Sequence, residues 1–276
     1  MIKINDGEFA YLVDYIRQNY GINLSQKRVL LEGRLTGYLL EQGIDSYSHY
    51  IKLIREDKTG REIANLLNKV TTNHTYFMRE AEHFDFLRNV TLPFMEQTVG
   101  DKDLRIWCAA SSTGEEPYTL AMILADYFGT SSGWDKTLLA SDISTRVLDY
   151  ANRGEYPAES VETLPAAWRN KYFHRVDANT FSITEYLRSQ VVFKRFNLMD
   201  PIAAKKPFHI VFCRNVMIYF DASTKMNLIN RIYDAMAPGG YLFIGQTESI
   251  ARPFSFRYIM PSVYQKPMRS DSQNDK

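Results

Sequence analysis

Residues 104–124, LRIWCAASSTGEEPYTLAMIL, decide the fold. A short apolar run at 104–109 is followed by small and polar residues and then by a segment with the apolar spacing of a helix. The same order recurs at TLLASDI (137–143), which precedes a predicted helix over 145–153. Further apolar runs are VVFKRFNL (191–198), FHIVFCR (208–214) and GYLFIG (240–245), and a helix is predicted over 221–240. Strands that alternate with helices predict an α/β fold with a parallel sheet covered on both faces.

The chain before this region shows helical spacing only, from residue 1 to about 75. The first predicted helix ends at Gly21, and Ser25 is the expected N-cap of a second helix that carries Val29, Leu30, Leu35, Leu39 and Leu40 and stops at Gly43. Asp45 or Ser46 is expected to cap a third helix, a fourth follows, and residues 85–97 predict another. The N-terminal part is therefore expected to be a small helical bundle.

Two later segments depart from the alternation of strands and helices. In residues 155–190, two β-like runs flank the turn 177–179, which predicts a hairpin in a small insertion. Residues 254–267 predict two more strands that turn at 260–262 and close the sheet antiparallel, and the tail 269–276 is expected to be disordered.

Composition excludes several classes of protein. Apolar residues make up 45% and charged residues 24% of the 276 residues, which is typical of a globular chain. The net charge of +1 disfavours nucleic acid as the main partner. Cys108 and Cys213 are too few for a disulfide scaffold and read as buried strand thiols, and the five histidines lack metal-ligand spacing. With no secretory signal and no long apolar run, we expect a cytoplasmic protein without direct membrane insertion.

The residues that follow each predicted strand are the candidate site, because ligands of parallel sheets bind at the carboxyl ends of the strands. Glu115 and Glu116 after the first strand suit a helix N-terminus and disfavour a phosphate, which argues against a dinucleotide and for a cationic or zwitterionic ligand. Asp142 is placed either to accept hydrogen bonds from a ribose or to cap the next helix. Later strands are followed by Asn197, suited to a base edge, and by Arg214.

Four long segments together resemble the CheR family, the S-adenosylmethionine-dependent methyltransferases that methylate glutamates of chemoreceptors. TTNHTYFMREAEHF (71–84) resembles the linker motif of the family and IWCAASSTGEEPYTLAM (106–122) its cofactor loop. FHIVFCRNVMIYFD (208–221) and GYLFIGQTES (240–249) resemble its fourth strand and the strand after it. The resemblance covers residues 5–266.

The resemblance implies a helical N-terminal domain (1–72), a linker with the first helix of the catalytic domain (73–103), and a Rossmann-like methyltransferase domain (104–268) with an inserted β subdomain at about 155–190. It also implies the roles of individual residues. The cofactor S-adenosylmethionine would be bound by Asn73, Thr75, Arg79, Glu115, Asp142, Asn197, Leu198, Arg214 and Asn215, and Arg79 and Tyr219 would lie nearest the reacting methyl group.

The implied partners are the cytoplasmic domains of methyl-accepting chemotaxis receptors, and we expect a monomer. The turn RVDANTF (175–181) is short and lacks the glycine of family members that bind a receptor C-terminal peptide, so methylation is expected to be independent of such a tether. Lys27, Arg28 and Arg34 on the second helix, diluted by Glu32, predict either a docking face or a solvated one. The alternatives are a methyltransferase with another substrate, a nicotinamide oxidoreductase, and a non-catalytic module that binds S-adenosylmethionine.

Overall fold

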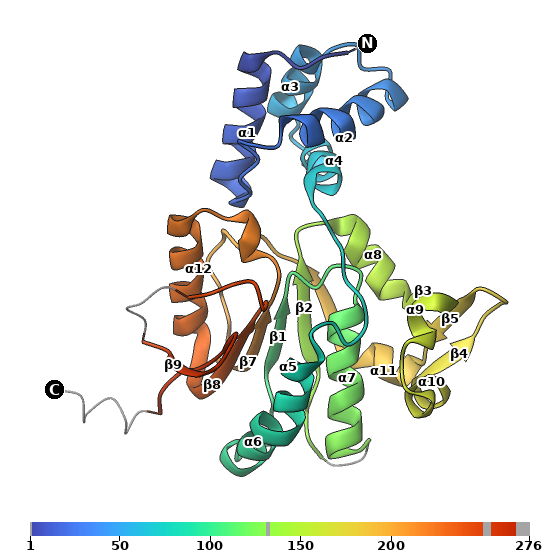
Figure 1. Cartoon of the computed structure of the whole chain (residues 1–276), viewed down its shortest axis with the longest axis vertical. Helices are drawn as coiled ribbons and strands as arrows, with labels where there is room; N and C mark the ends of the chain where they lie inside the picture. Colours follow the sequence, from blue (N-terminus) through green and yellow to red (C-terminus); the bar gives the residue numbers. More distant parts are fainter. Residues whose placement is uncertain (1, 131–132, 251–254, 269–276) are drawn as a thin grey trace.

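The computed structural model describes residues 2–130, 133–250 and 255–268, so the predicted disordered tail lies outside the described residues. Four helices form the N-terminal part, as predicted: α1 (Asp6–Tyr20), α2 (Arg28–Glu41), α3 (Tyr47–Glu56) and α4 (Arg61–Val70). Figure 1 shows them gathered above one end of the sheet, to which residues 71–80 connect them. The apolar faces of these helices pack into one cluster, which also contains residues from one face of the sheet.

The ends of the first three helices test the predicted caps. A capping box of Asn5 and Glu8 starts α1, which ends at Gly21, and Ser46 caps α3. The predicted cap of α2 is wrong: Ser25 hydrogen-bonds to the Asn23 side chain, and α2 begins three residues later without a side-chain cap.

The apolar series predicted for α2 is also only partly buried. Leu35 and Leu39 belong to the core, together with Leu31. Val29 and Leu40 are 85% and 63% exposed, because they lie on the side of the helix that faces away from the bundle.

Gly21 lies where the end of α1 meets the sheet domain. Its φ is +72°, and an added Cβ would lie 2.7 Å from Met199 Sδ and 3.2 Å from Phe220 Cδ1. We expect Gly21→Ala to lower the free energy of unfolding by about 1–2 kcal/mol for the left-handed backbone and by a further 1–3 kcal/mol or so for overpacking. Gly43→Ala is the matched control, because Gly43 has a φ of +69° and no atom within 4 Å of an added Cβ. Equal losses for the two variants in urea denaturation would contradict the close contact.

A seven-stranded sheet forms the centre of the second domain. Its strands are β1 (Ile106–Ala109), β2 (Leu138–Asp142), β6 (Val191–Arg195), β7 (Phe208–Cys213), β8 (Met236–Ile244), β9 (Arg257–Met260) and β10 (Val263–Gln265). They are arranged in the order β6-β2-β1-β7-β8-β10-β9, with β9 and β10 antiparallel as predicted and the others parallel. The chain leaves β1 toward β2 and returns to its other side as β7, so the strand order reverses between β1 and β7.

Helices cover both faces of this sheet (Figure 1). Crossover helices α7 (Glu115–Phe128), α8 (Thr145–Arg153) and α12 (Ala222–Ala235) link the parallel strands. Two hydrophobic clusters lie on the two faces of the sheet, and alternate residues of β1 belong to each. Ile106 and Cys108 pack with α7, and Trp107 and Ala109 pack with α12 and the N-terminal helices. Both cysteines are free and buried, as predicted.

Two of the predicted helices have different bounds in the structure. The helix predicted over 221–240 ends at Ala235, because Met236 already pairs with Phe208 and begins β8. The single helix predicted over 85–97 begins earlier and is divided into α5 (Ala81–Phe86), a π-helical turn (Leu87–Thr91) and α6 (Leu92–Thr98).

The insertion contains the predicted hairpin and additional elements. β4 (Phe173–Arg175) and β5 (Thr180–Ile183) pair antiparallel, and β3 (Glu155–Pro157) adds a third strand on the other side of β5. Of three short helices in the insertion, α9 (Ala158–Glu162) and α10 (Ala166–Tyr172) pack against this small sheet, and α11 (Glu185–Ser189) packs against α7 and β6. Within the described ranges, no helix is long and apolar enough to cross a bilayer.

Candidate functional site

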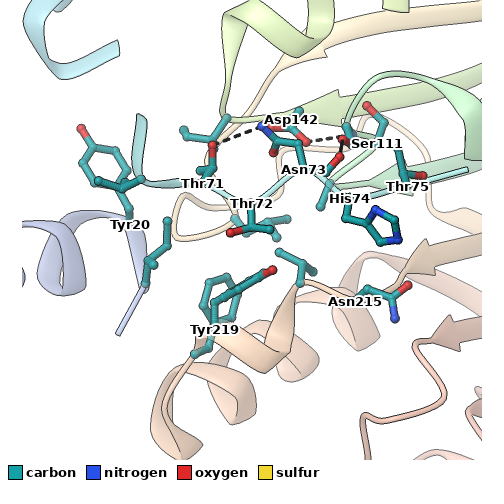
Figure 2. A pocket seen from close by; sticks show the side chains of 18 of the residues that line it. Tyr20, Thr71, Thr72, Asn73, His74, Thr75, Ser111, Asp142, Asn215 and Tyr219 are labelled. Carbon is teal, nitrogen blue, oxygen red and sulfur yellow. Dashed lines mark hydrogen bonds between the residues drawn. The ribbon is translucent and has the colours of Figure 1, made fainter. Parts of the chain in front are cut away.

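A cleft of about 1090 Å³, counted to its open mouth, lies at the carboxyl ends of β1, β2, β6 and β7. This is the position at which a parallel sheet binds ligands, next to the reversal of strand order. The linker 71–79 lies over it, with Asp142 and Asn73 along one wall and Tyr219 and Asn215 along the other (Figure 2).

The structure brings nearly all of the predicted site residues to this cleft. Those that line it are Asn73, Thr75, Arg79, Asp142, Asn197, Leu198, Arg214, Asn215 and Tyr219. Glu115 does not line it: its buried carboxylate accepts a 2.6 Å hydrogen bond from Thr113 Oγ1, and burial raises its pKa. Its neighbour Glu116 lines the cleft instead.

The loop between β1 and α7 is tightly wound beside the cleft. Ala110, Ser112 and Gly114 all have positive φ, at 58°, 48° and 99°. An added Cβ at Gly114 would lie 2.7 Å from Tyr156 Oη and 2.8 Å from Ala151 Cβ. Glycine is therefore needed here for packing against α8 and β3.

Asp142 is a buried carboxylate at the end of β2. Its exposed fraction is 7%, its Oδ2 accepts the Ser112 N–H at 2.9 Å, and its Oδ1 accepts the Ser144 N–H at 2.9 Å. Burial raises the pKa of Asp142 although these backbone hydrogen bonds oppose the change. Each oxygen retains a lone pair for a further donor, such as a ligand hydroxyl. The predicted alternative, capping of α8, belongs to Ser144, which accepts the Val147 N–H.

Arg214 is the most deeply buried cation at the cleft, with 1% of its side chain exposed. Its Nη1 donates to Glu116 Oε2 at 2.5 Å, and its Nη2 donates to Glu80 Oε2 at 2.9 Å and to the Arg79 carbonyl oxygen at 2.5 Å. Arg214 thus connects the linker to the end of β7 and to α7. Its guanidinium donates three hydrogen bonds within the protein.

The N-terminal domain contributes to the same cleft. Asn197 Nδ2 donates to the Asn19 carbonyl oxygen at 2.8 Å, and the Asn23 N–H donates to the Tyr219 carbonyl oxygen at 2.8 Å. Sequence reasoning missed the lining residues that accompany these bonds, which are Tyr20, Ile22, Leu24, Lys27 and Leu30. No local signal marks them, because only docking of the two domains brings them to the strand ends.

The basic residues of α2 and its N-cap are mostly used within the protein. Arg34 Nη1 donates to the carbonyl oxygens of Val70 and Thr71, and Arg28 bonds to Asp6 and to the Ile4 carbonyl oxygen. Lys27 is exposed, with its ammonium 5.5 Å from the centroid of the Tyr219 ring. A docking face, one of the two predicted interpretations of these residues, would therefore depend on Lys27 more than on Arg28 or Arg34.

Two carboxylates, Asp142 and Glu116, and three cations, Lys27, Arg79 and Arg214, line the cleft among apolar and neutral polar residues, and Glu116 is paired with Arg214. Asp142 and the neutral polar groups suit a ligand that carries hydroxyl groups and positive charge. The family described as "CheR methyltransferase, SAM binding domain" matches residues 73–263, and "CheR methyltransferase, all-alpha domain" matches residues 7–71. The chain belongs to the CheR family.

Relatives support this membership over nearly the whole chain. The chemotaxis protein methyltransferase of Borreliella burgdorferi is 39% identical over 271 residues, which are 96% of each chain. Chemotaxis protein methyltransferase 2 of Vibrio cholerae is 31% identical over 98% of this chain and 96% of its own. The Escherichia coli chemotaxis protein methyltransferase is 35% identical over 93% and 90% of the two chains.

The cofactor of this CheR-family chain is S-adenosylmethionine, and the chain is a methyltransferase of chemotaxis with a Rossmann-like catalytic domain. The cleft fits this cofactor, because carboxylates among its lining residues suit a sulfonium and an ammonium and Asp142 can accept hydrogen bonds from ribose hydroxyls. In the described ranges, no cluster of three or more His, Cys, Asp or Glu residues could hold a metal ion.

Proposed function

We propose that this protein transfers a methyl group to glutamate side chains in the cytoplasmic domains of methyl-accepting chemotaxis receptors, forming methyl esters. The observation that carries the proposal is the single cleft that joins the predicted cofactor residues to Arg79 and Tyr219 beneath an open mouth. The names of the full-length relatives support chemotaxis as the setting.

We assign cofactor binding to the predicted residues that line the cleft, from Asn73 to Asn215. Asp142 would hold the ribose hydroxyls, and Asn197 and Leu198 would lie beside the adenine. The Asn197 Nδ2 already donates a hydrogen bond to the Asn19 carbonyl oxygen. Asn197 would therefore contact the adenine through its backbone or through other atoms of its side chain. We propose that Glu116, which lines the cleft, meets the amino-acid portion of the cofactor instead of Glu115.

When bound, S-adenosylmethionine supplies a methyl group attached to a positively charged sulfur. The substrate carboxylate has a reference pKa of about 4.3 and is already ionised at neutral pH, so the protein needs no general base. The role of the protein is therefore to orient the carboxylate and to exclude water. Both Tyr219 and Arg79 line the cleft. In this proposal, Tyr219 donates a hydrogen bond to one carboxylate oxygen and Arg79 attracts the substrate charge.

The hairpin between β4 and β5 supports methylation without a receptor peptide tether. Its turn is closed by a 2.7 Å hydrogen bond from the Asn179 N–H to Asp177 Oδ1 and spans only residues 176–179 between the strands. We propose that substrate recognition depends on the region around the cleft and not on this hairpin.

The decisive experiment incubates the protein with methyl-labelled S-adenosylmethionine and cytoplasmic fragments of receptors from the same organism. We expect label on the receptor that mild alkali releases as methanol, and no label where the modified glutamates are replaced by alanine. Removing the C-terminal residues of the receptor fragment should leave the rate unchanged. Alkali-stable label would indicate another substrate, and cofactor binding without any transfer would indicate a non-catalytic module.

A further inference from the structure

The loop that carries Tyr219 is held by a buried carboxylate outside the cleft. Glu248 lies after β8, is 9% exposed, and does not line the cofactor cleft. Its Oε2 accepts the N–H groups of Gly245 at 2.7 Å and Asn215 at 3.0 Å, and its Oε1 accepts the Ile218 N–H at 3.1 Å. The Glu248 side chain therefore connects Gly245, at the end of β8, to Asn215 and Ile218 in the loop that follows β7.

The Ile218 bond is a helix cap. Ile218 lies in the 3₁₀ turn Met217–Tyr219, whose first N–H groups have no partner inside so short a helix. Glu248 supplies the missing acceptor from a distant part of the sequence. The next residue is Tyr219, so the capped turn directly determines where the phenol ring lies.

The backbone at both ends of this contact is adapted to it. Asn215 has a φ of +57°, in the left-handed region that asparagine adopts more readily than other residues except glycine. An added Cβ at Gly245 would lie 2.5 Å from Asn215 Nδ2 and 2.9 Å from Asn215 N, so only glycine permits this approach. On its other side Asn215 donates from Nδ2 to Glu80 Oε1 at 3.0 Å, which ties the same residue to the linker.

Among the residues that the structure describes, no cation forms an ion pair with Glu248. Burial raises its pKa, and the largest opposing contributions are hydrogen bonds from backbone N–H groups, first those of Gly245, Asn215 and Ile218. Burying a carboxylate is costly, and a purely structural loop closure does not require a charge. A carboxylate that accepts several N–H groups at once does provide a rigid, oriented anchor.

We propose that Glu248 is a positioning residue for methyl transfer: its carboxylate caps the turn before Tyr219 and fixes the phenol at the cleft. This inference rests on the proposed function, because Tyr219 has its role there. Gln in place of Glu248 keeps one acceptor oxygen but turns an NH₂ group toward backbone donors, so the cap is lost while the volume is kept.

A double-mutant cycle tests the coupling between the two residues. We expect Tyr219→Phe to lower kcat about 10- to 100-fold through loss of a hydrogen bond to a charged oxygen. Glu248→Gln should lower kcat about tenfold, with cofactor affinity within about threefold of the wild type in calorimetry. The double variant should be no slower than Tyr219→Phe alone. Losses that multiply, or an unchanged kcat in Glu248→Gln, would overturn the inference.

Two further variants separate positioning from general damage. Glu248→Asp keeps the carboxylate and should recover part of the lost kcat, and Glu185→Gln, at an exposed glutamate of α11, should change nothing. Hydrogen exchange provides a readout that needs no substrate: peptides that contain residues 215–218 should exchange faster in Glu248→Gln but not in Glu185→Gln. Absence of ester formation by the wild type would count against the proposed function, whereas unchanged exchange would count against Glu248 as the anchor.

Discussion

Replacing Asp142 by alanine is expected to weaken S-adenosylmethionine binding by at least about 100-fold in calorimetric titration. The proposed role of Asp142 is to accept two ribose hydroxyls, and hydrogen bonds to a charged group each contribute about 1.5–3 kcal/mol. Loss of both therefore corresponds to about 3 kcal/mol or more, and each 1.4 kcal/mol is about tenfold in affinity. Unchanged affinity would remove Asp142 from the site.

Asp149→Ala is the matched control for this prediction, because Asp149 is an exposed aspartate on the neighbouring helix α8. Asp142 also accepts the N–H groups of Ser112 and Ser144, so thermal unfolding must show that the Asp142 variant is folded before its affinity is read. We expect it to unfold at a lower temperature than the wild type but to remain cooperative.

The pH dependence of binding has a definite sign. Burial raises the pKa of Asp142, and a protonated carboxyl has one acceptor fewer and no charge. Affinity for the cofactor should therefore fall as the pH is lowered, and the fall should begin above the ordinary aspartate pKa of about 4. The Asp142→Ala variant should lack this part of the pH dependence.

The residues at the carboxyl ends of the strands could be predicted from the sequence, because apolar runs and the polar residues that come after them are local features. Asp142 and Arg214 each directly follow an apolar run, and parallel strands bring such residues to one edge. The partners of these side chains within the protein could not be predicted. The guanidinium of Arg214, which lines the cleft, is bonded to Glu116, Glu80 and the Arg79 carbonyl oxygen, and these bonds join distant parts of the sequence.

The remaining differences arise from geometry that has no local signature. Glu115 and Glu116 are adjacent in the sequence, and successive residues of a helix point about 100° apart, so only one of them faces the cleft. Leu24 and Lys27 reach the cleft because the N-terminal domain docks against the strand ends through bonds such as that of Asn23 to Tyr219. The spacing of apolar residues within one segment cannot indicate contacts between residues almost two hundred positions apart.

Replacing Arg214 by methionine is expected to lower the free energy of unfolding by about 3–5 kcal/mol, the usual cost of removing one partner of a buried ion pair. The side chains of Glu80 and Glu116 are only 11% and 13% exposed, so both carboxylates would remain in the interior without their cation. Methionine fills much of the arginine volume, and the loss therefore reports charge and hydrogen bonding more than a cavity. Urea denaturation at neutral pH measures it.

Arg214→Lys should recover only part of this loss. A lysine ammonium is a point charge and cannot reproduce the planar fork that reaches Glu116, Glu80 and the Arg79 carbonyl oxygen together. The triple variant Arg214→Met/Glu80→Gln/Glu116→Gln should be more stable than Arg214→Met alone, because the stranded charges are gone. If the triple variant were no more stable than Arg214→Met, packing rather than charge would explain the loss.

The dependence of this loss on pH distinguishes the same two causes. Burial raises the pKa of Glu80, but the bonds from Asn215 and Arg214 and the Arg214 charge outweigh it, so the pKa is below its usual value. A lowered pKa contributes stability that is present above the unfolded pKa of about 4.3 and is lost as the pH falls through the folded value. The stability difference between wild type and Arg214→Met should therefore keep its full size from pH 7 to about pH 4.3 and shrink as the pH falls further, through the lowered pKa of Glu80. A difference that stayed constant below about pH 4.3 would assign the role of Arg214 to packing of its side chain, whose guanidinium carbon lies 5.3 Å from the centroid of the Phe84 ring, and not to the ion pairs that tie the linker to the sheet.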